Sequence, residues 1–98
     1  MDFEIELSDR ARDNLKGFRK RDRQVIADAI DVQLRNEPAR PTRNRKPMED
    51  NPLAPWELRV GDFRVFYDIN VEEESVVILA VGHKVHNKLF IGGEEIEL

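Results

Sequence analysis

Residues 56–69, WELRVGDFRVFYDI, constrain the fold of this chain more than any other stretch, because apolar residues alternate on both sides of a Gly-Asp dipeptide. Strict alternation is typical of half-buried strands, and a two-residue loop that begins with glycine favours a type II′ turn. The stretch therefore predicts an antiparallel β-hairpin. Its register pairs the residues on either side of the loop in order: Val60 with Phe63, Arg59 with Arg64, Leu58 with Val65, Glu57 with Phe66 and Trp56 with Tyr67.

The alternation gives this hairpin two different faces. The apolar face, with its aromatic residues, is expected to pack under helices rather than to stack on bases. The opposite face carries Glu57, Arg59, Arg64 and Phe66. Two arginines directly opposite each other repel unless an anion compensates. Either this face is solvated and Glu57 supplies the countercharge, or it binds a polyanion such as a phosphodiester backbone, which suits the forked donors of arginine. Phe66 would then stack on a base or cover an apolar patch.

Length and composition indicate a small domain without covalent cross-links. With 98 residues we expect one domain spanning residues 1–98, which buries roughly two-thirds of its unfolded surface. The absence of cysteine excludes a disulfide framework and a thiolate metal site, and it fits a reducing cytosol. The sequence begins without a signal-peptide pattern, and its longest apolar run, residues 76–81, is too short to span a bilayer. We therefore expect a cytoplasmic protein that makes no membrane contact.

Charge is unevenly distributed along the sequence. Residues 1–47 hold 12 Lys and Arg against 9 Asp and Glu, a balance of +3, and residues 48–98 hold 4 against 11, a balance of −7, which gives the net charge of −4. Basic residues gather in residues 19–23 and 40–46. Local patches direct electrostatic steering more than total charge does, so a polyanionic partner is compatible with this chain, although its acidity weighs against one.

The N-terminal part of the sequence predicts a strand and a helical pair. Residues 2–7 alternate as a half-buried strand, after which Ser8 is a good N-cap for a helix at residues 9–19. Asp22 is expected to cap a second helix, which cannot continue much beyond residue 36 because Pro38 follows. The short connection between the two makes them antiparallel.

The remaining segments complete the predicted fold. All five prolines fall within residues 38–55, a basic segment without apolar periodicity that is expected to be one long functional loop. Residues 76–81 are apolar on both faces, as a central strand requires. A Gly-Gly turn then precedes one short terminal strand at residues 94–98. The expected fold is α+β: a small antiparallel sheet with an N-terminal helical hairpin packed on one face, in the order β-α-α-β-β-β.

This order, with W-E-L-R-V-G-D-F-R-V-F-Y followed by V-V-I-L-A-V-G-H-K, resembles the RelE/ParE toxin superfamily of bacterial type II toxin–antitoxin modules. The resemblance covers nearly the whole chain. The RelE branch implies a concave sheet face that holds mRNA in the ribosomal A site, where a ribose 2′-oxygen attacks the adjacent phosphate without a metal. The ParE branch implies a similar fold that poisons DNA gyrase. In both branches an antitoxin wraps and silences the toxin.

The resemblance carries over well to residues that contact phosphate. Arg64, in Gly-Asp-Phe-Arg, matches the hairpin arginine that contacts the scissile phosphate in RelE-like nucleases. Arg59 matches a basic position on the preceding strand, and Lys84 matches an arginine that follows the last long strand. Arg45 and Lys46, in the basic loop, are further candidates for contact with RNA.

The proton-transfer half of such a site is matched less well. Phe90 falls where active RelE-like enzymes place a tyrosine, and it offers an aromatic contact to RNA but no hydroxyl. His83 fits the His-Arg or Lys-Arg pair at the strand end, and Glu57 sits where some relatives carry a lysine. Attack by a 2′-hydroxyl needs a base near the nucleophile and an acid near the leaving oxygen. Glu57 with His83 or His86 is the candidate pair, unless both histidines are incidental surface residues.

These residues predict the toxin of a type II toxin–antitoxin system that cleaves mRNA on the ribosome, without metal or cofactor, and is neutralised by a cognate antitoxin. The facing arginines favour this interpretation. The missing tyrosine hydroxyl and the acidic charge favour the alternative, a non-enzymatic ParE-like inhibitor of DNA gyrase or a diverged toxin that only binds its antitoxin.

Overall fold

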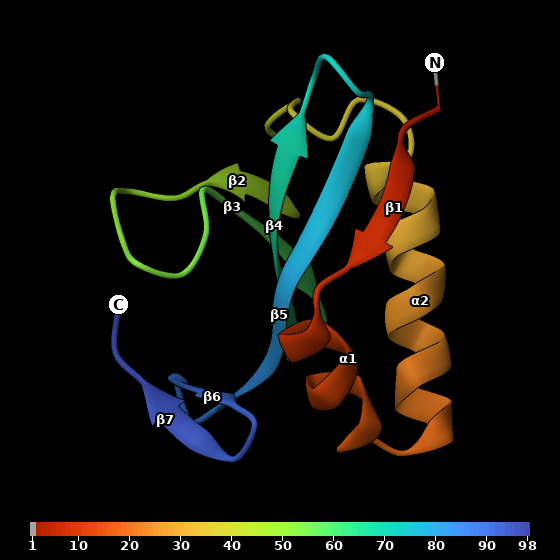
Figure 1. Ribbon diagram of the computed structural model, residues 1–98. Helices are drawn as coiled ribbons and strands as arrows, with labels where there is room; N and C mark the ends of the chain where they lie inside the picture. Colours follow the sequence, from red (N-terminus) through yellow and green to blue (C-terminus); the bar gives the residue numbers. More distant parts are fainter. Residues whose placement is uncertain (1) are drawn as a thin grey trace.

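The longest strand, β5 (Ser75–Val85), forms the centre of the sheet in the computed structural model, which describes residues 2–98. One edge of β5 pairs with β4 (Phe63–Asn70), and the two halves of its other edge pair with β1 (Glu4–Leu7) and β6 (Lys88–Ile91). The sheet follows the order β2-β3-β4-β5-β6-β7 (Figure 1). The remaining elements are α1 (Asp9–Lys16), α2 (Lys20–Leu34), β2 (Arg45–Pro47), β3 (Trp56–Val60) and β7 (Glu94–Ile96).

The predicted hairpin is confirmed in its register and is consistent with the predicted turn. β3 and β4 pair in the expected alignment, from Val60 and Phe63 at the turn to Trp56 and Tyr67 at the far end. Gly61 adopts a φ of +59°, the conformation that the first loop position of a type II′ turn requires. Local alternation and one glycine therefore determine this part of the sheet.

Helix α1 begins where the sequence predicts, whereas α2 begins earlier. The Ser8 hydroxyl accepts a hydrogen bond of 3.1 Å from an amide of the first turn and caps α1, which ends at Lys16 rather than at residue 19. The N-cap of α2 is Arg19, so the prediction of an Asp22 cap is wrong. Asp22 lies inside the first turn, where its charge complements the helix dipole. Within residues 2–98, no helix is long and apolar enough to cross a membrane.

The main core lies between the helices and one face of the sheet, which both helices cover (Figure 1). Tyr67 is fully buried there, and its hydroxyl donates a hydrogen bond of 2.9 Å to the Pro38 carbonyl. Burial raises the pKa of Tyr67. Trp56 and Phe63 pack against the same core, which confirms that these aromatic residues are structural. The buried members are Ala11, Ile26, Ile30, Leu34, Leu58, Val65, Tyr67, Val76, Ile78 and Val81.

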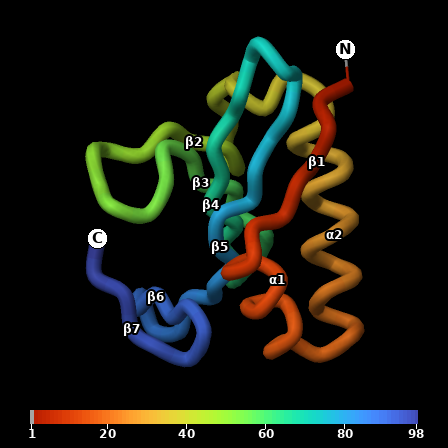
Figure 2. Tube along the Cα trace, viewed as in Figure 1, coloured from red at the N-terminus to blue at the C-terminus, as the bar shows by residue number. Residues whose placement is uncertain are grey.

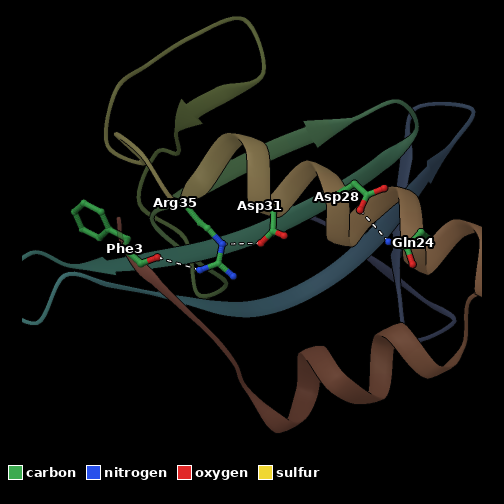
Figure 3. Close-up of polar contacts among 5 residues, drawn as sticks. All are labelled: Phe3, Gln24, Asp28, Asp31 and Arg35. Carbon is green, nitrogen blue, oxygen red and sulfur yellow. Dashed lines mark hydrogen bonds and ion pairs between the residues drawn. The ribbon is translucent and has the colours of Figure 1, made fainter. Parts of the chain in front are cut away.

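The C-terminal end of helix α2 is hydrogen-bonded to Phe3, the residue that precedes β1. The Phe3 amide donates to the Arg35 carbonyl at 2.7 Å. The Arg35 guanidinium donates back to the Phe3 carbonyl at 3.5 Å, as Figure 3 shows. Asp31 holds this guanidinium through an ion pair of 2.7 Å, and Gln24 donates a hydrogen bond of 2.8 Å to Asp28 on the same helix. The edge of the sheet is thereby fixed against the helix.

Three features of the sheet differ from the prediction. β1 pairs with β5 in parallel, so the sheet is mixed rather than wholly antiparallel. Residues 38–55 are not one loop, because β2 lies among them and pairs with β3. The C-terminal segment forms two strands, β6 and β7, around the Gly92-Gly93 turn in place of the single terminal strand predicted. These strands are short, and they form because a longer neighbour satisfies their backbone groups.

A second apolar cluster covers part of the sheet face opposite the helices. It joins residues 48–55, the loop between β2 and β3, to the β6–β7 hairpin, and both segments lie on the side away from the helices (Figure 2). Phe66 is fully buried at this place. The other buried members are Ala54, Ala80, Leu89 and Ile91. The face that the sequence presents as open is therefore partly covered.

Candidate functional site

Three charged side chains from three neighbouring strands meet on the face opposite the helices. Lys46 on β2 pairs in register with Glu57 on β3, and Arg64 lies on β4. One carboxylate oxygen of Glu57, Oε1, lies 3.8 Å from Lys46 Nζ and 4.0 Å from Arg64 Nε. These three residues are called the Glu57 cluster below. It contains the predicted phosphate-contacting arginine together with a carboxylate.

The Arg64 guanidinium is buried rather than exposed, so the prediction of an open arginine pair is wrong for this member. Arg64 is 7% exposed. Its Nη1 donates to the carbonyls of Gly61 at 2.7 Å and Phe63 at 2.8 Å, which means that the side chain curls back over its own turn. Burial lowers the pKa of Arg64, and the nearby Glu57 carboxylate opposes this effect. The guanidinium is therefore already engaged by groups of this chain.

Further basic groups lie around the Glu57 cluster. Arg59 pairs in register with Arg64 and is exposed. A hollow of about 470 Å³ opens beside Glu57, and its wall includes Lys84 and Lys88 together with residues 95–98. Lys84 and Glu57 thus line the same hollow, and both were predicted to belong to the site. Lys88 was not among the predicted residues, although its run K-L-F-I before a Gly-Gly turn is a recognisable hairpin signal.

A β-bulge determines which face the end of β5 presents. The register between β4 and β5 shifts at Phe66 and Tyr67, and Leu79 is the extra residue in β5. Beyond the bulge, His83 pairs with Phe63, whose side chain belongs to the helix-covered face. The imidazole is therefore on the opposite side of the sheet from the Glu57 cluster.

The predicted proton-transfer residues are not gathered at the Glu57 cluster. The ring of His83 stacks on Phe90 with centroids 5.9 Å apart, and it meets the edge of Phe18 at the same separation. Phe90 pairs with His83 in the sheet and shares its face. His86 is exposed in the turn between β5 and β6, where it has a φ of +51°. Of the predicted proton-transfer residues, Glu57 is the one that lies beside Arg64.

Two predicted RNA contacts are structural residues. Arg45 is 8% exposed, and its Nη1 donates to the carbonyl of Gln33 in the last turn of α2 at 2.5 Å and to that of Asn36, just after the helix, at 3.5 Å. A helix end leaves such carbonyls without internal partners, and Arg45 supplies the donor. Phe66 is fully buried in the second apolar cluster, so it has no surface on which a base could stack. Both side chains are therefore covered in this structure, and Phe66 fills an apolar patch, the other role that its position in the sequence allowed.

Among residues 2–98, no group of three or more His, Asp or Glu side chains comes together in a way that could hold a metal ion.

Comparison with known proteins agrees with this architecture. A family model described as the ParE toxin of the type II toxin–antitoxin system parDE matches residues 5–87. A chain of the RelBE2 toxin–antitoxin complex from Mycobacterium tuberculosis superposes with a TM-score of 0.75 at 26% identity, covering 86% of this chain and 93% of that chain. A chain of the archaeal RelE–RelB complex from Pyrococcus horikoshii shares the fold, with a TM-score of 0.69, 19% identity and coverage of 88% and 99%. No curated protein matches the sequence. The chain belongs to the ParE toxin family, within the RelE/ParE toxin superfamily, and is the toxin of a type II toxin–antitoxin system.

Proposed function

We propose that this toxin stops growth by binding DNA gyrase rather than by cutting mRNA. The observation that carries the proposal is the engagement of Arg64, whose guanidinium is buried, donates to two carbonyls of its own turn and has the Glu57 carboxylate 4.0 Å from Nε. A scissile phosphate would have to displace this carboxylate. Membership of the ParE family supports a gyrase target, because poisoning of gyrase is what that branch implies.

The chemistry of mRNA cleavage supports the same choice. Attack by a 2′-oxygen requires a base and an acid on either side of one phosphate. His83 and Phe90 lie on the helix-covered face, and Phe90 has no hydroxyl. Glu57 alone cannot serve as base and acid at opposite ends of the phosphate in one step. A non-enzymatic inhibitor needs none of these groups.

The partner that neutralises this toxin is proposed to be a cognate antitoxin, as the similar solved structures are toxin–antitoxin complexes. An apolar groove of about 350 Å³ between β1 and the two helices is the proposed docking place for an antitoxin segment. Ile5 and Leu7 line it from the strand, and Leu15, Ile26 and Ile30 line it from the helices. An amphipathic helix or an added strand buries apolar side chains in such a groove.

Gyrase inhibition has a direct test. Induction of this chain alone in a bacterial host is expected to arrest growth and to produce DNA breaks without new mRNA 5′ ends. The purified chain should reduce supercoiling by gyrase in vitro, and the complex with the product of the adjacent gene should not. Ribosome-dependent 5′ ends together with unchanged supercoiling would contradict the proposal.

Ribosome-dependent mRNA cleavage is the second candidate, and a specific observation favours it. Lys46, Arg59 and Lys84 surround Glu57 on the face opposite the helices, and Lys46 and Arg59 are exposed. Exposed cations along one face attract a phosphodiester backbone regardless of sequence. This candidate requires the Glu57 carboxylate to move away from Arg64 when RNA binds.

Substitution of Phe90 by Tyr separates the two candidates. Under the gyrase proposal Phe90→Tyr gains no mRNA cleavage. The added hydroxyl would belong to a ring that stacks on His83, on the opposite face of the sheet from Arg64. Primer extension on ribosome-bound mRNA measures the outcome, with the parent chain as control. A gain of roughly 100-fold, the usual contribution of a placed proton donor, would support the nuclease instead.

A further inference from the structure

The Glu57 carboxylate occupies an unusual place between two cations of very different exposure. Its Oε1 atom lies 3.8 Å from the exposed Lys46 ammonium and 4.0 Å from the buried Arg64 guanidinium. The side chains of Glu57 and Arg64 are each 9% exposed, whereas that of Lys46 is 60% exposed. A single anionic oxygen thus lies between a cation in the interior and a cation at the surface.

The carboxylate balances the charge of Arg64 without satisfying its hydrogen bonds. Both separations exceed the N–H···O distance of about 3 Å. Arg64 Nε is buried, and within residues 2–98 it has no hydrogen-bond partner. A buried donor without an acceptor is unfavourable, because its lost hydration is not replaced by a hydrogen bond. The place beside Arg64 therefore favours an anion with several oxygens that can approach closer than the tethered carboxylate does.

We propose that Glu57 is a built-in anion that fills an oxyanion site between Arg64 and Lys46, and that a phosphate group binds there when this side chain is shortened. Arginine and lysine are the residues that bind phosphate, arginine through its directional N–H donors and lysine as a point charge. The hollow that Glu57 shares with Lys84 and Lys88 supplies the entry from solvent. In the native chain the site is closed to phosphate by the chain itself.

This inference deepens the proposed function, because a closed oxyanion site keeps nucleic-acid phosphate away from Arg64. It can be tested without any measurement of toxicity. A chain that failed to inhibit gyrase would leave the phosphate experiment unchanged, and an absent phosphate site would leave the gyrase experiment unchanged.

The experiment compares thermal unfolding of the full chain and of Glu57→Ala in inorganic phosphate and in chloride, at equal ionic strength and pH. Glu57→Ala is expected to gain roughly 6–11 °C in Tm when phosphate is present at about ten times its Kd. The native chain is expected to show no such difference. Glu72→Ala removes the same charge at an exposed position in the β4–β5 turn, and it is the matched control. The double variant Lys46→Ala/Glu57→Ala should lose most of the response.

A second arm distinguishes free phosphate from a nucleic-acid backbone. Fluorescence anisotropy with a short single-stranded oligoribonucleotide measures whether Glu57→Ala also accepts a phosphodiester. A response to phosphate alone supports a site for a small anion, and a response to both supports a backbone site. Equal phosphate responses in the native chain, Glu57→Ala and Glu72→Ala would overturn the proposal.

Glu57→Ser keeps the inference testable if Glu57→Ala does not fold. This variant shortens the side chain, removes its charge and keeps a small polar group. Its loss of stability relative to the native chain should be smaller in phosphate than in chloride, because phosphate replaces the missing anion. Equal losses in the two salts would overturn the proposal.

Discussion

Gly82→Ala is expected to lower the free energy of unfolding by about 3 kcal/mol, the upper part of the range for an overpacked interior. A methyl group at this position would overlap the Phe90 carbonyl oxygen and would lie 2.8 Å from Ile91 Cγ1. Both neighbours belong to β6, which pairs with β5 at this point. Because one clashing atom is backbone, a change of rotamer cannot relieve the overlap, and the two strands have to separate.

Urea unfolding followed by circular dichroism measures this loss. Gly93→Ala is the control, since Gly93 has a φ of +84° with open space where a side chain would be. Its cost is limited to the strain of a left-handed conformation, about 1 kcal/mol. If Gly82→Ala and Gly93→Ala lost equal and small amounts of stability, the close approach of β6 to Gly82 would be contradicted.

The sequence predicted every residue pair of the β3–β4 hairpin, because the features that determine this pairing are local in the sequence. Alternation assigns each side chain to a face, and Gly61 fixes the position of the turn. The same reasoning placed Tyr67 in the core and Ser8 at the start of α1. Each of these outcomes depends on residues within a few positions of one another.

The exposure of the opposite face could not be predicted in this way. A period of two tells which residues share a face, but it does not tell what covers that face. Phe66 is buried by Ala54 from the β2–β3 loop and by Leu89 and Ile91 from β6, all far away in the sequence. The burial of Arg64 has a different origin, because its guanidinium bonds to the carbonyls of its own turn. Neither event leaves a periodic signal.

The sheet face on which His83 lies depends on a single extra residue in β5. Leu79 forms a bulge in β5, and one extra residue reverses the face of every residue beyond it. His83 consequently faces the helices, where it stacks on Phe90. The run of apolar residues around Leu79 gives no sign of the bulge, since both faces of a central strand are apolar. Sequence reasoning therefore could not tell which of the predicted site residues would lie side by side.

Arg64→Ala is expected to destabilise the fold rather than to remove an exposed ligand. Loss of one partner from a buried ion pair leaves the other charge uncompensated, at a cost of about 3–5 kcal/mol. Lys46 still lies 3.8 Å from Glu57, so the lower end of this range, about 3 kcal/mol, is expected. Urea unfolding at neutral pH and low salt measures the loss. Arg59→Ala removes the same charge from the exposed member of the register pair, and it should change stability by less than about 0.5 kcal/mol.

A double-mutant cycle tests whether this loss belongs to the pair. Glu57→Gln/Arg64→Met removes both buried charges and replaces the guanidinium stem with an apolar one of similar length. The single variants of this cycle are Glu57→Gln and Arg64→Met. Because neither charge is left alone in the double variant, it should be more stable than the summed losses of these two single variants predict, by about 1–3 kcal/mol. Additive losses would contradict a coupled pair. If Arg64→Ala instead kept full stability while abolishing toxicity, Arg64 would act as a ligand for the target, and RNA cleavage would replace gyrase inhibition as the better account of this toxin.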